Sequence, residues 1–315
     1  MDYLFGTDCA GNGGIYCFAL KNGQPVLCGH TQLPLPMYTV LKNQTAYVLL
    51  RGPKGQNGSL VTAPILANGR LGPFSQPVST KGQVPCHLCV SKGEVYVANY
   101  ISGNVVKMPG TVVCHSGHSV HPTRQTAAHT HFVLPTPKED YILCVDLGLD
   151  TVFVYTRELQ PVSSAKVPPG SGCRHFVFSR DGAWLYCVNE LSSDVSVFSY
   201  SSGRLTYRAT YQAFAAPPAN STAAAIRLCG NYLYLSHRGA NCISRFEAEN
   251  GRLHFIENTP CGGESPRDFD ILNNYLYIAN ESGHLGIIDL NGPAPKLCAS
   301  MPLGQHLLGI NFYKG

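Results

Sequence analysis

A short strand-like segment recurs seven times along the 315-residue chain, and its spacing constrains the fold more than any other feature. The copies end at Thr7, Leu50, Asn99, Asp146, Asn189, His237 and Asn280, so successive copies lie 43 to 49 residues apart. After each copy come a short loop and a third strand, at 15–18, 60–63, 105–108, 152–155, 195–198, 243–246 and 285–288. A strand-rich unit of roughly 40–50 residues is typical of a propeller blade of about four strands. The sequence therefore predicts an all-β, seven-bladed β-propeller.

The two ends of the chain support a closed ring. The chain begins on a second-type strand at 3–7, with no first strand before it, and finishes on a first-type strand at 306–313. The C-terminal strand is therefore expected to join the N-terminal blade, which covers two sheet edges that would otherwise invite association. Because the repeat runs from end to end, we expect one domain spanning 1–315. A β-sandwich is the competing fold, but sandwich strands show less regular periods.

Composition narrows the class of protein. The net charge is only +4, and no basic run interleaved with aromatic residues occurs, which argues against nucleic-acid binding. The N-terminal residues lack a basic region followed by an apolar run, and no stretch of about 18 apolar residues occurs, so neither a signal peptide nor a membrane span is expected. Most of the 13 cysteines lie inside predicted strands, which is typical of reduced, buried thiols. We expect a cytoplasmic protein that is a monomer or weak homodimer.

Three motifs resemble ligand sites. The glycine loop at 11–14 precedes a strand and not a helix, so it lacks the helix N-terminus that holds a phosphate. Cys86 and Cys89 have zinc-knuckle spacing, but no second pair follows them. The segment 114–131 is rich in histidine, the commonest metal ligand, although a solvated loop is the simpler interpretation. We predict no metal and no cofactor, and a metal or redox role for this segment stays open as an alternative.

The hairpin at 173–190 predicts where polar side chains converge. Asp181-Gly182 between two apolar runs is the strongest short hairpin signal, and the hairpin brings Arg174 at its start beside Glu190 at its end. Equivalent positions in neighbouring blades are expected to meet at one mouth, with these charged or titratable residues: His131, Arg174, Glu190, Arg238 and Arg267. Pairing of the arginines and glutamates as structural salt bridges is the competing interpretation.

Further residues are predicted at the same mouth. His87 and His175 open first strands, and we align both with His131. Asn99 ends a second strand. We predict that Arg267, His87, Asn99 and His175 bind the substrate.

At these residues the chain resembles the lactonase family of seven-bladed propellers, which includes bacterial-type 6-phosphogluconolactonase and the fungal carboxy-cis,cis-muconate lactonizing enzyme. The resemblance covers nearly the whole chain. It is carried by Pro85-Cys86-His87, His129-Thr130-His131, Gly172-Cys173-Arg174-His175 with Val188-Asn189-Glu190, and His237-Arg238-Gly239. By this resemblance the functional residues are His131, Arg174, Glu190 and Arg238. The chain departs from the family where Ala225-Ile226-Arg227 replaces the frequent Glu-Ile-Arg.

The resemblance implies hydrolysis of a sugar lactone, 6-phosphoglucono-1,5-lactone in the first place, in a central funnel lined by Arg, His and Glu. One arginine would stabilise the oxyanion formed by attack on the ring carbonyl, and another would hold the phosphate or carboxylate of a small anionic substrate. We expect Glu190 to act as base and His131 as acid or positioning group, although the sequence does not decide their order. Two alternatives stay open: muconate-type cycloisomerisation in the same funnel, and a propeller that binds a ligand or partner without chemistry.

Overall fold

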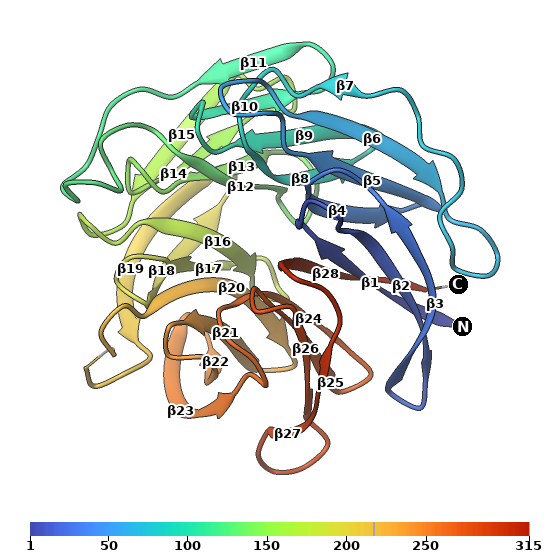
Figure 1. Cartoon of the computed structure of the whole chain (residues 1–315). Coiled ribbons are helices and arrows are strands. Elements are labelled where there is room, and N and C mark those ends of the chain that lie inside the picture. Colours follow the sequence, from blue (N-terminus) through green and yellow to red (C-terminus); the bar gives the residue numbers. More distant parts are fainter. Residues whose placement is uncertain (217, 315) are drawn as a thin grey trace.

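The chain folds into a ring of seven antiparallel sheets, each of four strands. The computed structural model describes residues 1–216 and 218–314. Figure 1 is a view along the axis of the ring. The sheets radiate from its centre, and their innermost strands are β4, β8, β12, β16, β20, β24 and β28. The described ranges contain no helix of the length and apolarity that a membrane span requires. The predicted seven-bladed β-propeller is confirmed.

The blades follow one another around the ring. The first is formed by β28 (Leu307–Lys314), β1 (Asp2–Asp8), β2 (Gly14–Lys21) and β3 (Gln24–Gln32). The second is β4 (Pro36–Lys42), β5 (Thr45–Leu50), β6 (Ser59–Pro64) and β7 (Val78–Ser79). The third is β8 (Pro85–Ser91), β9 (Glu94–Asn99), β10 (Asn104–Lys107) and β11 (Thr111–Cys114). The fourth is β12 (Thr130–Pro135), β13 (Ile142–Asp146), β14 (Thr151–Tyr155) and β15 (Pro161–Lys166).

The remaining three blades keep the same order. The fifth is β16 (Cys173–Phe178), β17 (Trp184–Asn189), β18 (Asp194–Ser201) and β19 (Arg204–Gln212). The sixth is β20 (Thr222–Cys229), β21 (Tyr232–Arg238), β22 (Cys242–Glu249) and β23 (Arg252–Pro260). The seventh is β24 (Pro266–Leu272), β25 (Tyr275–Asn280), β26 (His284–Asp289) and β27 (Lys296–Pro302).

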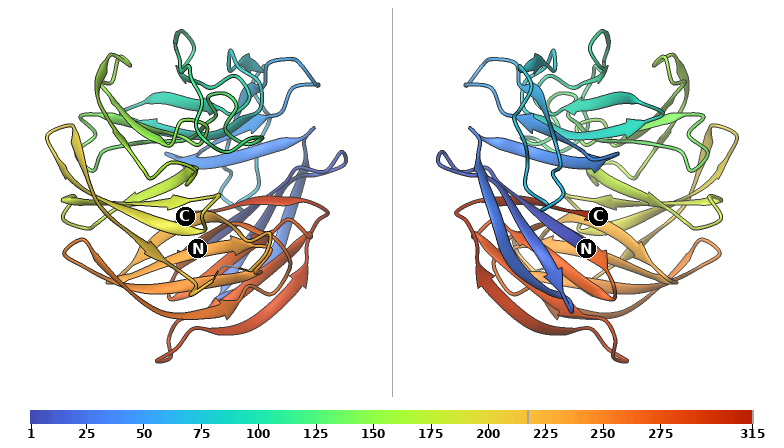
Figure 2. Two further views of the ribbon diagram at one scale, coloured as in Figure 1. Left: turned by 90° about the vertical axis from the view of Figure 1, so that its left-hand side faces the viewer. Right: turned by 90° about the vertical axis from the view of Figure 1, so that its right-hand side faces the viewer.

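The C-terminal strand closes the ring, as the sequence predicts. β28 pairs antiparallel with β1, from Asp2 opposite Lys314 to Asp8 opposite Leu307. Figure 2 shows the two termini side by side at this blade. Ile310 is fully buried in the apolar cluster that joins the first blade to the seventh, where it lies with Leu4 and Tyr277. The two ends of the chain are therefore held together by both hydrogen bonds and apolar packing.

Each innermost strand contains a β-bulge close to its start. In β12, Thr130 pairs with Asp146 and Phe132 with Val145, so His131 has no partner on β13. The same skipped position is Met37 in β4, Cys86 in β8, Arg174 in β16, Arg267 in β24 and Leu308 in β28. In β20 two residues, Ala224 and Ala225, are skipped. Bulges re-aim side chains, and they are over-represented next to active sites.

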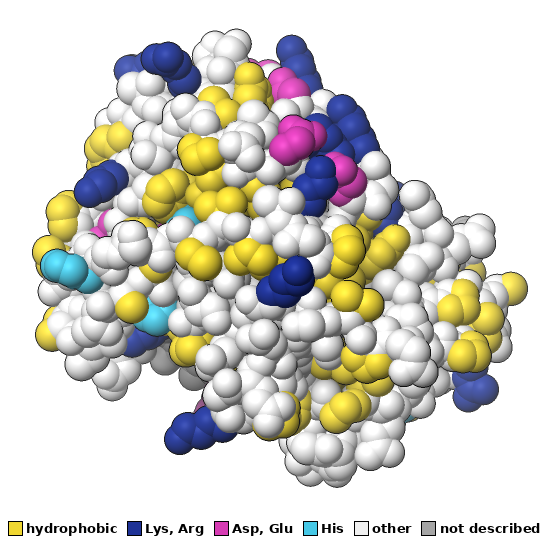
Figure 3. Space-filling view, turned by 90° about the horizontal axis from the view of Figure 1, so that it is seen from above, with side chains coloured by type: hydrophobic (Ala, Val, Ile, Leu, Met, Phe, Trp, Pro, Cys, Tyr) yellow, Lys and Arg dark blue, Asp and Glu magenta, His cyan; other side chains and the backbone are white. Residues whose placement is uncertain are grey.

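Charged side chains on the outer surface do not form a large patch of one sign on the face drawn in Figure 3. On the face drawn in Figure 3, most Lys and Arg lie toward the margins, a basic side chain also lies near the middle, and those at the upper right are interspersed with Asp and Glu. No continuous basic band crosses this face.

The closure predicts that a core residue of β28 contributes strongly to stability. Ile310→Ala should lower the free energy of unfolding by about 2–5 kcal/mol, because it removes buried methyl groups and leaves a cavity between two blades. Val26→Ala on the exposed face of β3 is the control, and we expect it to cost less than about 1 kcal/mol. Urea unfolding followed by circular dichroism checks both. Equal effects of the two substitutions would contradict the closure.

Candidate active site

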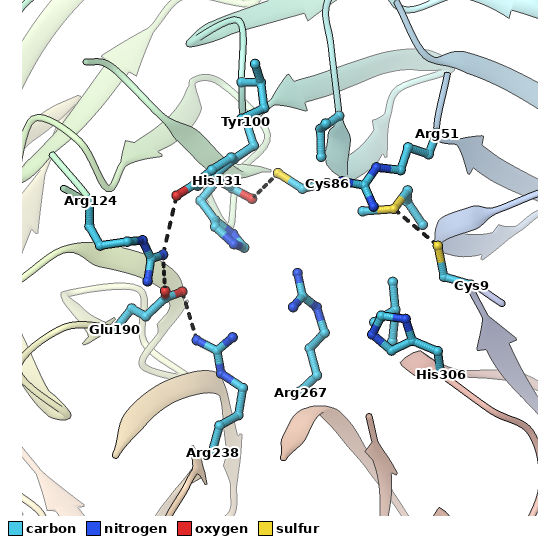
Figure 4. Close-up of a pocket in the computed structure, with 14 residues that line it drawn as sticks. Cys9, Arg51, Cys86, Tyr100, Arg124, His131, Glu190, Arg238, Arg267 and His306 are labelled. Atoms are coloured by element: carbon cyan, nitrogen blue, oxygen red, sulfur yellow. Dashed lines mark hydrogen bonds and ion pairs between the residues drawn. The ribbon is translucent and has the colours of Figure 1, made fainter. Parts of the chain in front are cut away.

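A cavity of about 390 Å³ opens at the end of the ring where the innermost strands begin. Figure 4 shows side chains from many blades pointing into it. Its charged and titratable lining consists of Arg51, Arg124, His131, Glu190, Arg238, Arg267 and His306. Its other lining residues are Cys9, Met37, Val84, Cys86, Tyr100, Ile101 and Leu308.

Many of these residues occupy one of two repeated positions. The bulge position supplies Met37, Cys86, His131, Arg267 and Leu308, which is why side chains from five different strands face the same space. The bulged Arg174 lies just beneath, in a much smaller cavity that His131 and Arg267 also line.

The second repeated position directly follows the second strand of a blade. It supplies Arg51, Tyr100, Glu190 and Arg238, the last of these at the end of β21. The backbone fixes it in the same way in several blades: Arg51 N–H donates to the Leu35 carbonyl at 3.0 Å, and Glu190 N–H donates to the Gly172 carbonyl at 2.7 Å. These side chains therefore project from a rigid rim.

Glu190 binds three arginines that come from three parts of the chain. Its Oε2 accepts from Arg174 Nε at 2.9 Å and pairs with Arg238 Nη2 at 3.1 Å, and its Oε1 accepts from Arg124 Nη2 at 2.5 Å. The glutamate side chain is only 3% exposed. Burial alone would raise the pKa of Glu190, but the positive charges of Arg238 and Arg174 outweigh it and hold the pKa well below its usual range. Glu190 is therefore a carboxylate at neutral pH.

Arg124 is a site residue that the sequence analysis missed. It comes from the long loop between β11 and β12, where its backbone N–H donates to His121 Nδ1. The buried neighbour Gln125 anchors the loop by donating to the Leu147 carbonyl at 2.8 Å. No repeat signal marks this loop, so the repeat pattern alone could not have found Arg124.

Arg51 was also missed, although a signal for it existed. It follows Leu50, the end of a second strand, just as Glu190 follows Asn189. An alignment of all seven strand ends identifies this position, as it does for Tyr100.

Arg174 is buried more deeply than the other site arginines. It is 2% exposed, and its Nη1 donates to the Ala224 carbonyl at 2.6 Å, across the wide bulge of β20. Burial, together with the charges of Arg238 and Arg267, lowers the pKa of Arg174 to about 9. Arg174 therefore remains positively charged at neutral pH, with Glu190 as its counter-ion.

His131 is buried, and one of its ring nitrogens, the buried Nδ1, has no hydrogen-bond partner among the described residues. Burial, reinforced by the charge of Arg174, lowers the pKa of His131 well below its usual value. Figure 4 shows the imidazole projecting into the cavity between Glu190 and Arg267. The ring is therefore neutral at pH 7 and can accept a proton.

The alignment of His87 and His175 with His131 is wrong by one residue. Both follow a bulge and do not occupy it, so they turn away from the cavity and line up with Phe132. The rings of His87 and His175 both pack against Phe132, with centroids 3.8 and 4.2 Å from it, and they lie 5.9 Å from each other. Neither histidine lines the main cavity, because side chains on successive strand residues point to opposite faces and a bulge shifts that alternation; His175 lines the smaller cavity with His131 and Arg174.

Asn99 also lies outside the main cavity. It is fully buried, and its Nδ2 donates to the Thr80 carbonyl at 3.0 Å and to Asn104 Oδ1 at 2.7 Å. Asn189 occupies the same position in the fifth blade and donates to Asp194 Oδ1 at 2.7 Å. These amides hold the loop after the second strand, so Asn99 has a structural role.

Two residues of the histidine-rich segment, His115 and His129, make structural contacts. His115 is buried between Asp146 Oδ2 and the Tyr155 hydroxyl, each at 2.7 Å, and the ring of His129 stacks on Tyr100. Among the described residues no three His, Cys, Asp or Glu side chains are arranged to hold a metal ion.

Cys86 lines the cavity but is a poor nucleophile. Burial raises the pKa of its thiol to about 12, although the charges of Arg174 and Arg267 oppose this. The reactive form of cysteine is the thiolate, which is scarce at neutral pH with such a pKa.

Comparisons with known proteins agree with this fold. The family model described as "Lactonase, 7-bladed beta-propeller" matches residues 3–297. A 6-phosphogluconolactonase of Bacillus subtilis (strain 168) is 30% identical to this chain. The alignment is 316 residues long and covers 91% of this chain and 90% of that protein.

Solved structures are similar over the full length. A putative 6-phosphogluconolactonase from Bacteroides fragilis has a TM-score of 0.90 and 25% identity, and the match covers 99% of this chain and 98% of that one. A periplasmic gluconolactonase from Pseudomonas aeruginosa has a TM-score of 0.85 and 25% identity, covering 100% of this chain and 99% of that one. The chain therefore belongs to the lactonase family of seven-bladed β-propellers.

Proposed function

We propose that the protein hydrolyses 6-phosphoglucono-1,5-lactone to 6-phosphogluconate in the cavity around His131. The observation that carries the proposal is that one neutral histidine and several arginine side chains line the same pocket. Related proteins named 6-phosphogluconolactonase and gluconolactonase support a sugar lactone as the substrate.

The neutral imidazole of His131 supplies the base. It takes a proton from water, the resulting hydroxide adds to the ring carbonyl, and the carbonyl oxygen becomes an oxyanion. When the oxyanion collapses, the bond to the ring oxygen breaks, and the imidazolium returns its proton to that oxygen. Proton transfer of this kind contributes about 10²–10⁴ in rate.

Arg238 and Arg267 are placed to stabilise the oxyanion, because both line the cavity with His131. Donors fixed in advance and directed at developing charge usually make the largest catalytic contribution. Each is held by a carboxylate: Arg238 by Glu190, and Arg267 by Glu281 at 2.7 Å.

We propose for Glu190 a role other than that of the base, which is the role that the sequence suggested. Both carboxylate oxygens of Glu190 are bound by guanidinium groups, whereas His131 Nδ1 has no hydrogen-bond partner among the described residues. We propose that Glu190 holds Arg124, Arg174 and Arg238 together against their mutual repulsion. His131 then serves as base first and as acid second.

The direct test is the turnover of freshly prepared 6-phosphoglucono-1,5-lactone by the purified protein, with the spontaneous rate subtracted. We expect saturable hydrolysis well above the background rate. The absence of hydrolysis, with muconate-type cycloisomerisation observed instead, would replace this proposal.

Removal of the His131 imidazole should cause a large loss of hydrolysis rate. His131→Ala should lower kcat by about 10²–10⁴, because water loses its proton acceptor. The matched control is His118→Ala, which removes an exposed histidine from the loop that precedes β12. Steady-state kinetics check both variants, and unchanged kcat in His131→Ala would rule out the assigned base.

Glu190→Gln should reduce both stability and activity. An uncharged amide leaves buried guanidinium groups without a counter-ion, and breaking a buried pair in this way costs about 3–5 kcal/mol. Glu158→Gln, which removes a largely exposed carboxylate that lies 4.0 Å from Lys107 Nζ, should cost about 0–1 kcal/mol. Thermal and urea unfolding measure the difference, and equal stabilities of the two variants would contradict the role of Glu190.

The pH dependence follows from the lowered pKa of His131. The base must be unprotonated, so kcat/KM should stay level as the pH falls from 8 through the ordinary histidine pKa of about 6.5 and should decline only well below that value. A stopped-flow pH profile of kcat/KM checks this. A decline with its midpoint at or above pH 7 would contradict a buried, neutral His131 as the base.

A further inference from the structure

The two sides of the cavity differ in how their positive charges are compensated. On one side, Arg124, Arg174 and Arg238 all bind Glu190. On the other side, Arg51 and His306 face the same cavity, and neither side chain makes a hydrogen bond or ion pair with another described residue. The uncompensated positive charge therefore lies across the cavity from Glu190.

Arg51 projects from a fixed position and not from a loose loop. It occupies the strand-end position that Glu190 and Arg238 occupy in their blades, and its N–H donates to the Leu35 carbonyl. His306 is held beside it in the ring by two backbone hydrogen bonds: its carbonyl accepts from Cys9 N–H at 2.9 Å, and its N–H donates to Asp8 Oδ1 at 2.8 Å.

Arg267 lies between the two sides. Figure 4 shows its guanidinium near the middle of the cavity, with Glu190 on one side and Arg51 and His306 on the other. The charges of Arg51 and Arg267 both act on the thiol of Cys9, where they oppose the burial that raises its pKa. Both guanidinium groups therefore act on the same part of the cavity wall.

The charge of the lining exceeds what a neutral ligand needs. Among the described residues, four arginines and one glutamate line the main cavity, which leaves a net charge of +3 from these groups; adding the buried Arg174 and Glu281, the partner of Arg267, does not change this sum. A phosphate group carries nearly two negative charges and accepts the forked N–H groups of arginine.

We infer that Arg51 and His306 form a phosphate-binding subsite that makes the enzyme select a phosphorylated lactone over a neutral one. This inference rests on the proposed function. It orients the substrate with its lactone carbonyl toward His131 and its phosphate toward β4, β5 and β28.

The test compares kcat/KM for 6-phosphoglucono-1,5-lactone with kcat/KM for glucono-1,5-lactone. In Arg51→Gln the ratio of the two should fall about 5- to 30-fold, as expected for loss of a charge-assisted hydrogen bond near solvent. Arg180→Gln is the matched control: it removes an exposed arginine from the β16–β17 turn, at the other end of the blade, and should leave the ratio unchanged.

A second measurement does not depend on turnover. Inorganic phosphate should raise the Tm of the wild-type protein and of Arg180→Gln, and the rise should be reduced in Arg51→Gln and in His306→Gln. A ratio that does not change in Arg51→Gln, or a phosphate effect that persists in both variants, would overturn the subsite. Failure of the wild type to hydrolyse either lactone would instead refute the proposed function, and the phosphate titration would still decide whether the subsite exists.

Discussion

A bulge near the start of each innermost strand determines which side chains face the central cavity of this propeller. A regular strand would alternate its side chains between the two faces of the blade. The bulge removes one residue from the ladder and turns it toward the axis of the ring, so six different strands each direct one side chain to the same region. His131, Arg174 and Arg267 come together in this way although more than 130 residues separate the first from the last. The catalytic proposal depends on that geometry.

Glu190 supplies the electrostatic counterpart of the bulges. Arginines that converge on one space repel each other, and Arg174 shows the effect, since the charges of Arg238 and Arg267 help burial to lower its pKa. A single buried carboxylate that contacts three of them makes the cluster stable without filling the cavity. Because the carboxylate is occupied in this way, we propose that His131 carries out the proton transfers.

The fold could be predicted from the sequence almost completely, whereas the site could be predicted only in part. The second strands fix the blades because each is a buried apolar run at a regular interval, and β13 and β17 end at the predicted residues Asp146 and Asn189. The side on which a residue lies depends on a bulge, and nothing in the apolar pattern of 173–178 reveals one. His87 and His175 were therefore placed in the funnel, although they pack against Phe132. Arg124 needed the path of a long loop, which carries no periodic signal.

The most direct measurement of the whole account is a crystal structure of the protein with 6-phosphogluconate bound. The product carboxylate should contact His131, Arg238 and Arg267. The phosphate should lie on the side of Arg51 and His306. A product molecule bound outside this cavity, or bound in it with no contact to His131, would contradict the claim that the bulged side chains form a lactone-hydrolysing centre.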